Sequence, residues 1–334
     1  MSSIIKTKTD KASSNGTAYH QRNEGIPFDL QFINDLRINK SAVERRAATL
    51  TTRRSVKKAW QAAWLLRAIT CIDLTTLAGD DTPGNVTRLC AKALHPVRQD
   101  ILDKLGMGDE KLTVGAVCVY HNMIPDAKKA LGDSGMPIAA VSTAFPAGQI
   151  PHKEKIKQIE LSVKAGAKEI DIVISRKLVL TGDWKGLYKE VADYRRACGE
   201  AHMKAILATG ELSTLTNVAK ASMVCMMAGS DFIKTSTGKE SVNATIPVSL
   251  VMVRAIRTYY EKTGFKVGFK PAGGIRSAKQ ALAWLFLMKE ELGDEWLKND
   301  LFRFGASSLL SDIERQLEHF VTGRYSASYR HPMA

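Results

Sequence analysis

Residues 231–270 read DFIKTSTGKESVNATIPVSLVMVRAIRTYYEKTGFKVGFK. Two short apolar runs, one ending at Lys234 and the other at Lys270, flank a segment whose apolar residues recur at helical spacing. Pro247 lies near the first turn of this helix and Gly264 ends it. Near-continuous apolar runs that alternate with amphipathic helices are typical of a parallel sheet covered by helices. The stretch therefore predicts a strand, a helix and a second, parallel strand.

The same alternation continues from about residue 66 to about residue 320. Six further apolar runs are AITCIDLTTL (68–77), VGAVCVY (114–120), IAAVSTAF (138–145), EIDIVI (169–174), KAILATGE (204–211) and FRFGASS (302–308). Eight such units in roughly 250 residues match a closed (β/α)8 barrel, the TIM barrel, which is the predicted fold. An open, doubly wound α/β sheet is the alternative. In both folds the carboxyl ends of the strands hold the functional site.

The chain before the barrel has a different character. Its first residues are polar and show no regular pattern, whereas amphipathic helix patterns follow, with Trp60 and Trp64 on one apolar stripe. The predicted organisation is a disordered tail at residues 1–25, an N-terminal helical extension at 26–65, the barrel at 66–322 and a C-terminal tail at 323–334. The extension is expected to form an accessory layer on the barrel.

The composition limits where in the cell the protein is expected and whether it is expected to use a metal or cofactor. Five cysteines occur in no CxxC or Cys/His ligand spacing, and the seven histidines form no motif such as HExxH. These spacings argue against a disulfide framework and a zinc site, so we expect no metal and no cofactor. No apolar run reaches the roughly 18 residues that a membrane span requires, and the N-terminus lacks the apolar core of a signal peptide. We therefore predict a cytoplasmic protein without membrane contact.

The formal net charge is +14, and it is unevenly distributed. Residues 1–60 carry 12 Lys and Arg against five Asp and Glu, which is half of the excess. A positive charge is compatible with nucleic acid, a membrane surface or an anionic small substrate. The basic cluster lies in a helical stretch without a nucleic-acid motif, which favours a solvated helix face and leaves RNA or DNA contact as the alternative. Its members are Arg45, Arg46, Arg53, Arg54, Lys57 and Lys58.

Lys234 and Lys270 are the first candidates for chemistry. They are 36 residues apart, the spacing of one β-α-β unit, and are expected at the ends of adjacent parallel strands. Two partly buried ammonium groups repel each other, which lowers their affinity for protons. Such a lysine can form a Schiff base with a carbonyl compound and so withdraw the electrons released when a carbon–carbon bond breaks. A single strand-end lysine is more commonly solvated or salt-bridged, but the pair favours catalysis.

Acidic residues accompany the two lysines. Asp171 interrupts the apolar run EIDIVI, and a carboxylate buried there requires a partner, which neighbouring lysines would provide. In that position Asp171 can transfer protons through water while a Schiff base forms and a bond breaks. Asp73 in IDLTTL is a similar candidate, with a capping or turn role as the alternative.

Small residues after the last two strands predict a phosphate site. Gly273 and Gly274 follow the seventh strand in PAGGIRSA, and Ser307 and Ser308 begin a helix after the eighth strand in GASSLLSDI. In (β/α)8 barrels these loops and the helix N-terminus commonly hold a phosphate. Lys239 is an additional cationic candidate, and turn geometry is the alternative explanation for the glycines.

These segments together resemble the deoxyribose-phosphate aldolase family. The resemblance rests on IDLTTL, EIDIVI, LATGEL, DFIKTSTGK, VGFKPAGGIR and FRFGASSLL, and it covers about residues 50–325 in the family's order. The longer N-terminus with QAAWLLRAITCIDLTTLAGDD is similar to the animal branch. The resemblance implies a class I, metal-independent aldolase on a (β/α)8 barrel. Such an enzyme reversibly cleaves 2-deoxy-D-ribose 5-phosphate to D-glyceraldehyde 3-phosphate and acetaldehyde in deoxyribonucleotide catabolism.

The resemblance also implies roles for individual residues. Lys234 corresponds to the lysine that forms the Schiff base, Lys270 to the lysine that perturbs it, and Asp171 to the acid that relays protons. Segments that line the family's substrate site contain Asp73, Thr209 and Lys204. The family's phosphate contacts correspond to Lys239, Gly273, Gly274, Ser307 and Ser308.

The resemblance has limits at both ends of the chain. Bacterial members end in a mobile tail with a terminal tyrosine that assists proton transfer, whereas this chain continues past Tyr325 and Tyr329, so neither tyrosine is assigned a role. The first 50 or so residues have no counterpart in short bacterial members. The predicted partner is a small phosphorylated sugar, and assembly into a homo-oligomer is left open. The alternative functions are a Schiff-base aldolase for another phosphorylated sugar and a nucleic-acid-associated protein that uses its basic N-terminal helices.

Overall fold

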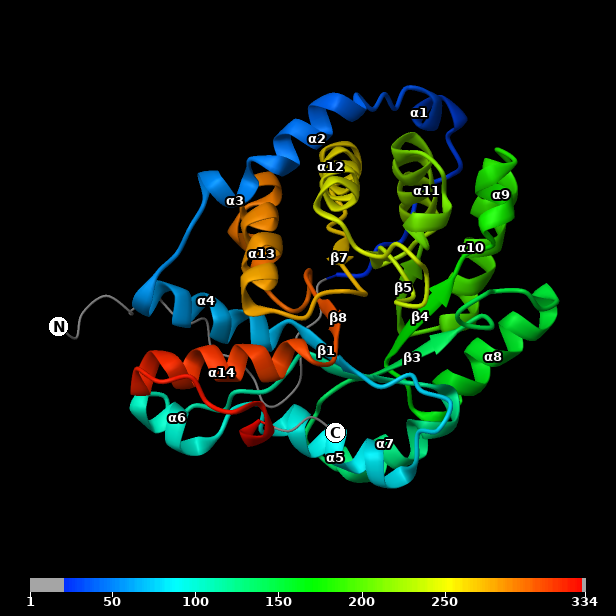
Figure 1. Cartoon of the computed structure of the whole chain (residues 1–334). Helices are drawn as coiled ribbons and strands as arrows, with labels where there is room; N and C mark the ends of the chain where they lie inside the picture. Colours follow the sequence, from blue (N-terminus) through cyan, green and yellow to red (C-terminus); the bar gives the residue numbers. More distant parts are fainter. Residues whose placement is uncertain (1–20, 332–334) are drawn as a thin grey trace.

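The computed structural model describes residues 21–331, in which eight parallel strands form a barrel surrounded by helices (Figure 1). The strands are β1 (Ile72–Thr75), β2 (Ala116–Val119), β3 (Ile138–Ser142), β4 (Glu169–Val173), β5 (His202–Ile206), β6 (Phe232–Lys234), β7 (Gly268–Lys270) and β8 (Phe304–Ala306). They pair in the order β7-β6-β5-β4-β3-β2-β1-β8. Seven of the eight apolar runs contain a whole strand, and the run at 204–211 overlaps β5, which begins two residues earlier. Most of the predicted N-terminal tail, residues 1–20, and the last three residues of the chain lie outside the described residues.

Backbone hydrogen bonds close the barrel between β8 and β7. The amide of Phe269 donates to the carbonyl of Leu301 at 2.9 Å, and the amide of Arg303 donates back to the carbonyl of Phe269 at 3.0 Å. The amide of Gly305 donates to the carbonyl of Pro271 at 2.9 Å. Closure pairs the backbone groups that an open sheet leaves at its edges. The predicted (β/α)8 fold is therefore confirmed, and the open doubly wound alternative is wrong.

Helices connect successive strands and cover the outside of the barrel. They are α5 (Pro83–Leu94), α6 (Gln99–Lys104), α7 (Ile124–Leu131), α8 (His152–Ala165), α9 (Arg176–Leu180), α10 (Trp184–Cys198), α11 (Leu215–Met227), α12 (Ile246–Thr263), α13 (Ala278–Leu292) and α14 (Leu309–Thr322). Short 3-10 turns are η1 (His121–Met123), η2 (Thr209–Glu211), η3 (Asp294–Leu297) and η4 (Ser328–Arg330). In α12 the side chain of Thr245 caps the first turn, Pro247 lies in that turn and Gly264 ends the helix at φ 77°.

Four N-terminal helices pack along one side of the barrel (Figure 1). They are α1 (Leu30–Asn34), α2 (Lys40–Ala48), α3 (Leu50–Arg53) and α4 (Lys58–Thr70). Helix α1 contacts α11, α2 contacts α12, α3 contacts α13, and α4 packs against α13 and α14. Each of the first three helices buries one apolar side chain, namely Ile33, Val43 and Leu50. Burial of apolar area thus attaches the extension to the barrel helices.

The buried stripe of α4 differs from the predicted one. Its buried residues are Ala62, Leu65, Ala68 and Ile69. Trp60 is 74% exposed, and Trp64 is only half-buried. The prediction of a buried tryptophan stripe is therefore wrong, because the aliphatic face of α4 is the buried one, whereas Trp60 is exposed and Trp64 packs only partly against Phe286 of α13.

The described chain begins with an anchor on the barrel. The Nδ2 group of Asn23 donates to the carbonyls of Met226 at 2.7 Å and Ser230 at 2.9 Å, and its Oδ1 accepts from the hydroxyl of Tyr259 at 3.0 Å. The amide of Asn23 donates to Asp231 at 3.1 Å. These contacts satisfy a buried amide side chain. These contacts fix the chain to the barrel at Asn23, two residues before residue 25, the predicted end of the disordered tail.

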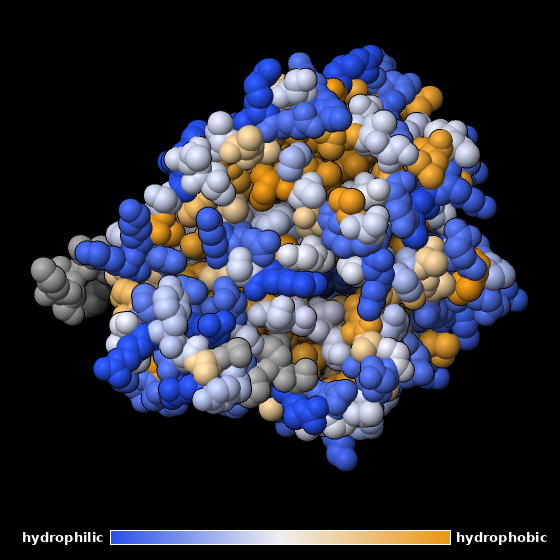
Figure 2. All heavy atoms as spheres, in the orientation of Figure 1, coloured by the Kyte–Doolittle hydropathy of each residue, from blue (hydrophilic) through white to orange (hydrophobic). Residues whose placement is uncertain are grey.

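The surface is mixed in polarity. Figure 2 shows hydrophilic residues over most of the periphery of one face, while apolar residues reach this surface in smaller patches between helices. Within residues 21–331, no helix is long and apolar enough to cross a membrane. The large apolar core lies between the barrel strands and the surrounding helices.

Candidate active site

Three charged side chains meet inside the barrel. Oδ2 of Asp171 on β4 accepts hydrogen bonds from Nζ of Lys234 at 2.7 Å and from Nζ of Lys270 at 2.8 Å. The register pairs Lys234 of β6 with Lys270 of β7, as their spacing predicts. All three side chains are at most 3% exposed. One buried carboxylate therefore holds both ammonium groups.

A further set of buried charges adjoins this group. Nζ of Lys204 forms an ion pair with Glu169 and lies 3.6 Å from Oδ2 of Asp73 and 3.5 Å from Oδ1 of Asp171. The guanidinium of Arg303 donates to Oδ1 of Asp73 at 2.5 Å and to Oε1 of Glu169 at 2.9 Å. Each of these side chains is at most 1% exposed. The interior of the barrel thus contains a connected network of buried charges.

Glu169 and Arg303 are members of this network that the sequence analysis missed. A signal for Glu169 was present, because it lies two residues before Asp171 on the same strand and so shares its face. Arg303 lies directly before β8 in an aromatic segment, where a single arginine gives no indication of its direction. Their contact joins residues 134 positions apart, and it depends on closure of the barrel.

The charges shift one another's pKa values. Burial alone would raise the pKa of Asp171, but the ammonium groups of Lys234, Lys270 and Lys204 outweigh it and hold that pKa well below its usual range. Burial would also raise the pKa of Asp73, and Lys270 is the main group that lowers it instead. For Lys270, burial lowers the pKa, whereas Asp171 and Asp73 raise it above its ordinary value. Lys270 is therefore a persistent cation beside Lys234, and the prediction that pairing lowers the proton affinity of both lysines is wrong for Lys270.

These shifts predict that acid destabilises the folded protein. The carboxyls of Asp73, Glu169 and Asp171 have lower pKa values when folded, so at low pH the unfolded chain binds more protons. The stabilisation from these carboxyls is complete above their pKa values in the unfolded chain, which are near about pH 4. It is lost as the pH falls toward their lower pKa values in the folded protein. The raised pKa of Lys270 gives stabilisation that is complete below about pH 10 and is lost only above it.

Urea titrations should therefore give a free energy of unfolding that falls steeply between about pH 5 and pH 3. The fall should be shallower in a folded Asp73→Asn variant, because this variant has lost one of the shifted carboxyls. A free energy of unfolding that is the same at pH 3 and pH 5 would contradict the assignment of ionised carboxylates to the barrel interior.

Lys234 also lines an open cavity of about 400 Å³. The predicted phosphate residues on its wall are Lys239, Gly273, Gly274, Ser307 and Ser308. Further lining residues with polar side chains are Thr75, Thr76, Thr237 and Arg276, which the sequence analysis did not select. The cavity thus brings a buried amine together with the loops after β6, β7 and β8.

The local backbone explains why this wall suits an anion. Gly273 and Gly274 have φ angles of 83° and 82°, a conformation that favours glycine. A Cβ at Gly273 would also lie 2.6 Å from the side chain of Asn243. Ser308 is the N-cap position of α14, and its side chain makes no capping hydrogen bond to the first turn. The amides and dipole at this helix start favour a negative group in the cavity.

Thr209 is not among the residues that line this cavity. It begins η2 after β5, and its backbone amide donates to the carbonyl of Thr235 at 2.9 Å. Its buried Oγ1 has no hydrogen-bond partner within residues 21–331. Lys204 and Asp73 also lie away from the cavity wall, and they contact the catalytic candidates through the charge network.

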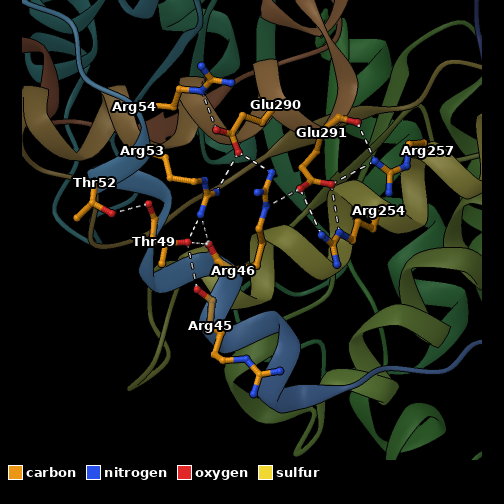
Figure 3. A network of polar contacts seen from close by, with 10 residues as sticks. All are labelled: Arg45, Arg46, Thr49, Thr52, Arg53, Arg54, Arg254, Arg257, Glu290 and Glu291. Carbon is orange, nitrogen blue, oxygen red and sulfur yellow. Dashed lines mark hydrogen bonds and ion pairs between the residues drawn. The ribbon is translucent and has the colours of Figure 1, made fainter.

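Three arginines of the basic N-terminal cluster converge on one carboxylate (Figure 3). Arg46, Arg53 and Arg54 donate to Glu290 of α13 at 2.8, 3.0 and 2.8 Å. The side chain of Glu290 is only 7% exposed, whereas Arg45 extends away from this contact. Three arginines of the cluster are therefore engaged by a carboxylate of the protein itself, and nucleic-acid contact has no support from this arrangement.

Within residues 21–331, the cysteines and metal-ligating residues add no second reactive centre. All five cysteines are buried and free. In the part of the chain that the structure describes, no group of three or more His, Cys, Asp and Glu side chains is placed to hold a metal ion. The expectation that the protein uses neither metal nor cofactor stays a prediction.

A closed barrel of eight parallel strands, with an open cavity and charged side chains at the carboxyl ends of its strands, defines a (β/α)8 enzyme. The model of the DeoC/LacD aldolase family matches residues 67–313. The chain belongs to this family of aldolases.

Curated relatives match nearly the whole chain. A human protein named deoxyribose-phosphate aldolase is 62% identical over 314 residues, which are 93% of this chain and 99% of the human protein. A mouse protein of the same name is 63% identical over 312 residues, which are 93% of this chain and 98% of that protein. Among solved structures, a tetrameric deoxyribose phosphate aldolase from Aeropyrum pernix has a TM-score of 0.55 at 22% identity, and the match covers 84% of this chain and 99% of that one. This structural likeness supports the fold.

Proposed function

We propose that this chain is a class I deoxyribose-phosphate aldolase. It reversibly cleaves 2-deoxy-D-ribose 5-phosphate to D-glyceraldehyde 3-phosphate and acetaldehyde, the activity that its family membership and the names of its relatives support. The observation that carries the proposal is the amine of Lys234, which is bound to Asp171 and opens into a cavity lined by a helix start and two glycines.

In this proposal Lys234 is the nucleophile. Its neutral Nζ adds to C1 of the open-chain sugar, and loss of water gives a protonated imine. Asp171 is 2.7 Å from Nζ and relays the protons of these steps. Because the pKa of Asp171 lies well below its usual range, the group rests as a carboxylate, which accepts a proton in one step and passes it on in the next. Lys270 supplies a fixed positive charge 2.8 Å from the same carboxylate.

The protonated imine is the electron sink for bond cleavage. Removal of the proton from the C3 hydroxyl breaks the C2–C3 bond, releases glyceraldehyde 3-phosphate and leaves an enamine on Lys234. The enamine takes a proton at C2, and water then hydrolyses the imine to release acetaldehyde and restore the free amine. Lys204 and Asp73 act as positioning residues, because Lys204 contacts Asp171, Asp73 contacts Lys270, and neither lines the cavity.

The phosphate is assigned to Gly273, Gly274, Ser307 and Ser308, with Lys239 as a cationic contact. These residues form the part of the cavity wall next to the start of α14. Contacts to a phosphate that takes no part in the reaction hold the sugar in the reactive position. A substrate role for Thr209 is also retained as a proposal, supported by its buried hydroxyl without a protein partner within residues 21–331.

Loss of the two serine hydroxyls should affect phosphorylated substrate selectively. A Ser307→Ala, Ser308→Ala variant is expected to lower kcat/KM for deoxyribose 5-phosphate by roughly 10- to 100-fold, because a hydrogen bond to a charged group contributes about 1.5–3 kcal/mol. Turnover of unphosphorylated deoxyribose should change little. Ser311→Ala is the matched control, since its hydroxyl donates to His331 outside the cavity. An equal loss of kcat/KM with both sugars would show that Ser307 and Ser308 do not bind the phosphate.

Product analysis tests the reaction itself. Acetaldehyde and a triose phosphate should appear in equal amounts when deoxyribose 5-phosphate is added. A Schiff-base aldolase for another phosphorylated sugar is the rival function, and failure to release acetaldehyde, together with turnover of a different sugar phosphate, would favour it. No observation in the structure favours the nucleic-acid alternative over these.

The proposed organisation keeps the four predicted segments: the tail at 1–25, the extension at 26–65, the barrel at 66–322 and the C-terminal tail at 323–334. Contacts of α1, α2 and α3 with α11, α12 and α13 support the extension as a layer on the barrel. A cytoplasmic location and assembly into a homo-oligomer stay predictions for this chain.

A further inference from the structure

A second cavity lies between the N-terminal extension and the end of α13. Its volume is about 840 Å³, which is in the range of small-molecule sites. Arg46, Arg53, Arg54 and Trp64 line it from the extension, and Glu290 and Phe286 line it from α13. We call it the arginine hollow. It shares no lining residue with the cavity beside Lys234.

Positive charge in the arginine hollow exceeds negative charge. Glu290 is the carboxylate to which all three arginines of the hollow donate (Figure 3). Lys289 is paired with Asp294 and so leaves this balance unchanged. The adjoining Glu291 already receives Arg254 and Arg257.

Taken together, five guanidinium groups surround two carboxylates. Neighbouring like charges repel, and a bound dianion would relieve this repulsion. Burial would raise the pKa of Glu290, but Arg54 and Arg53 lower it, so the carboxylate stays ionised and the excess is positive.

Hydrogen-bond donors remain for such an anion. Arg54 has a side chain that is 61% exposed and uses only Nε on Glu290. Arg46 uses one terminal nitrogen on the same carboxylate, and its Nε lies 3.6 Å from Oε1 of Glu291. Within residues 21–331, both terminal nitrogens of Arg54 and Nη1 of Arg46 make no hydrogen bond to a protein acceptor. Paired guanidinium nitrogens match the oxygens of a phosphate.

One wall of the arginine hollow is aromatic. The rings of Trp64 and Phe286 have centroids 5.4 Å apart and an interplanar angle of 59°. Val56 lines the same cavity. Trp64 is half-buried, so part of its indole is available to a ligand. An aromatic wall beside arginines suits a planar base joined to a phosphate, because nucleobases stack on aromatic rings.

We propose that the arginine hollow binds a nucleoside monophosphate. Its phosphate dianion contacts Arg46, Arg53 and Arg54, and its base lies against Trp64 and Phe286. The ligand joins the extension to α13 because its contacts come from both. The site is separate from the aldolase site, and the proposal does not depend on the reaction at Lys234.

Isothermal titration calorimetry with adenosine 5′-monophosphate tests the proposal on the full chain. We expect saturable binding with a Kd below about 1 mM, at least about tenfold tighter than binding of adenosine, inorganic phosphate or ribose 5-phosphate. Arg54→Gln should weaken binding by about tenfold or more, because it removes charged hydrogen-bond donors. Arg45→Gln is the matched control, since Arg45 extends away from the hollow, and it should leave binding unchanged.

Trp64→Leu separates a nucleotide site from a simple phosphate site. This variant should weaken binding of adenosine 5′-monophosphate by about tenfold and leave that of inorganic phosphate unchanged. Lys239→Gln, which alters the other cavity, should leave nucleotide binding unchanged. Equal affinities for the nucleotide and inorganic phosphate, or no saturable binding at about 1 mM, would overturn the proposal. Nucleotide affinity that is unaffected by both Arg54→Gln and Trp64→Leu would also overturn it, and circular dichroism spectra confirm that the variants are folded.

Discussion

Lys234→Met is expected to lower kcat/KM for deoxyribose 5-phosphate by at least about 10⁴-fold, because the variant lacks the amine that forms the Schiff base. Methionine has a similar length and no nucleophilic nitrogen. The fold should persist, since Asp171 keeps its hydrogen bond to Lys270 at 2.8 Å and its contact with Lys204 at 3.5 Å. The loss is measured by the rate of acetaldehyde release.

Chemical trapping identifies the nucleophile independently of the rate. Borohydride reduction with deoxyribose 5-phosphate, followed by peptide mass mapping, should find the reduced adduct on Lys234 and none in Lys234→Met. Lys239→Met is the matched control, because Lys239 lines the same cavity but is exposed, and it should retain the adduct on Lys234. An adduct on Lys270 instead of Lys234 in the unaltered protein would show that Lys234 is not the nucleophile.

The barrel was predictable because its evidence is local. Each strand is a short apolar run, and each helix carries its own signals, such as Pro247 and Gly264 at the ends of α12. The register then placed Lys234 beside Lys270, as a β-α-β unit of 36 residues requires. Asp171 was recognisable because a carboxylate in an apolar run is expensive without a partner.

The rest of the site depends on contacts that no local pattern encodes. Glu169 stands at the edge of its apolar run, and its partner Arg303 is 134 positions away, beyond the point where the barrel closes. The sequence showed that the N-terminal arginines form a basic cluster, but it did not show which groups their side chains contact. Their partner Glu290 is more than 230 positions away on α13, so only packing of the extension brings them together.

The stability prediction with the largest expected effect concerns Glu169. Glu169→Gln should lower the free energy of unfolding by about 3–5 kcal/mol, because the variant keeps the buried cations of Arg303 and Lys204 but removes one of their carboxylate partners. Urea unfolding at neutral pH measures the change. Glu200→Gln makes the same substitution at an exposed residue paired with Arg22, and it should change stability by less than about 1 kcal/mol.

The same variant distinguishes a positioning role from a catalytic one. Glu169 contacts Lys204 and Arg303, and it does not line the cavity, so Glu169→Gln should still form the borohydride adduct on Lys234. Full turnover is not required for this test. Lys204 lies 3.5 Å from Asp171, so displacement of its ammonium in the variant should change the pH dependence of kcat. A variant as stable as the unaltered protein would show that Glu169 is not essential to the buried charge balance, since the remaining carboxylates Asp73 and Asp171 would then suffice for four buried cations.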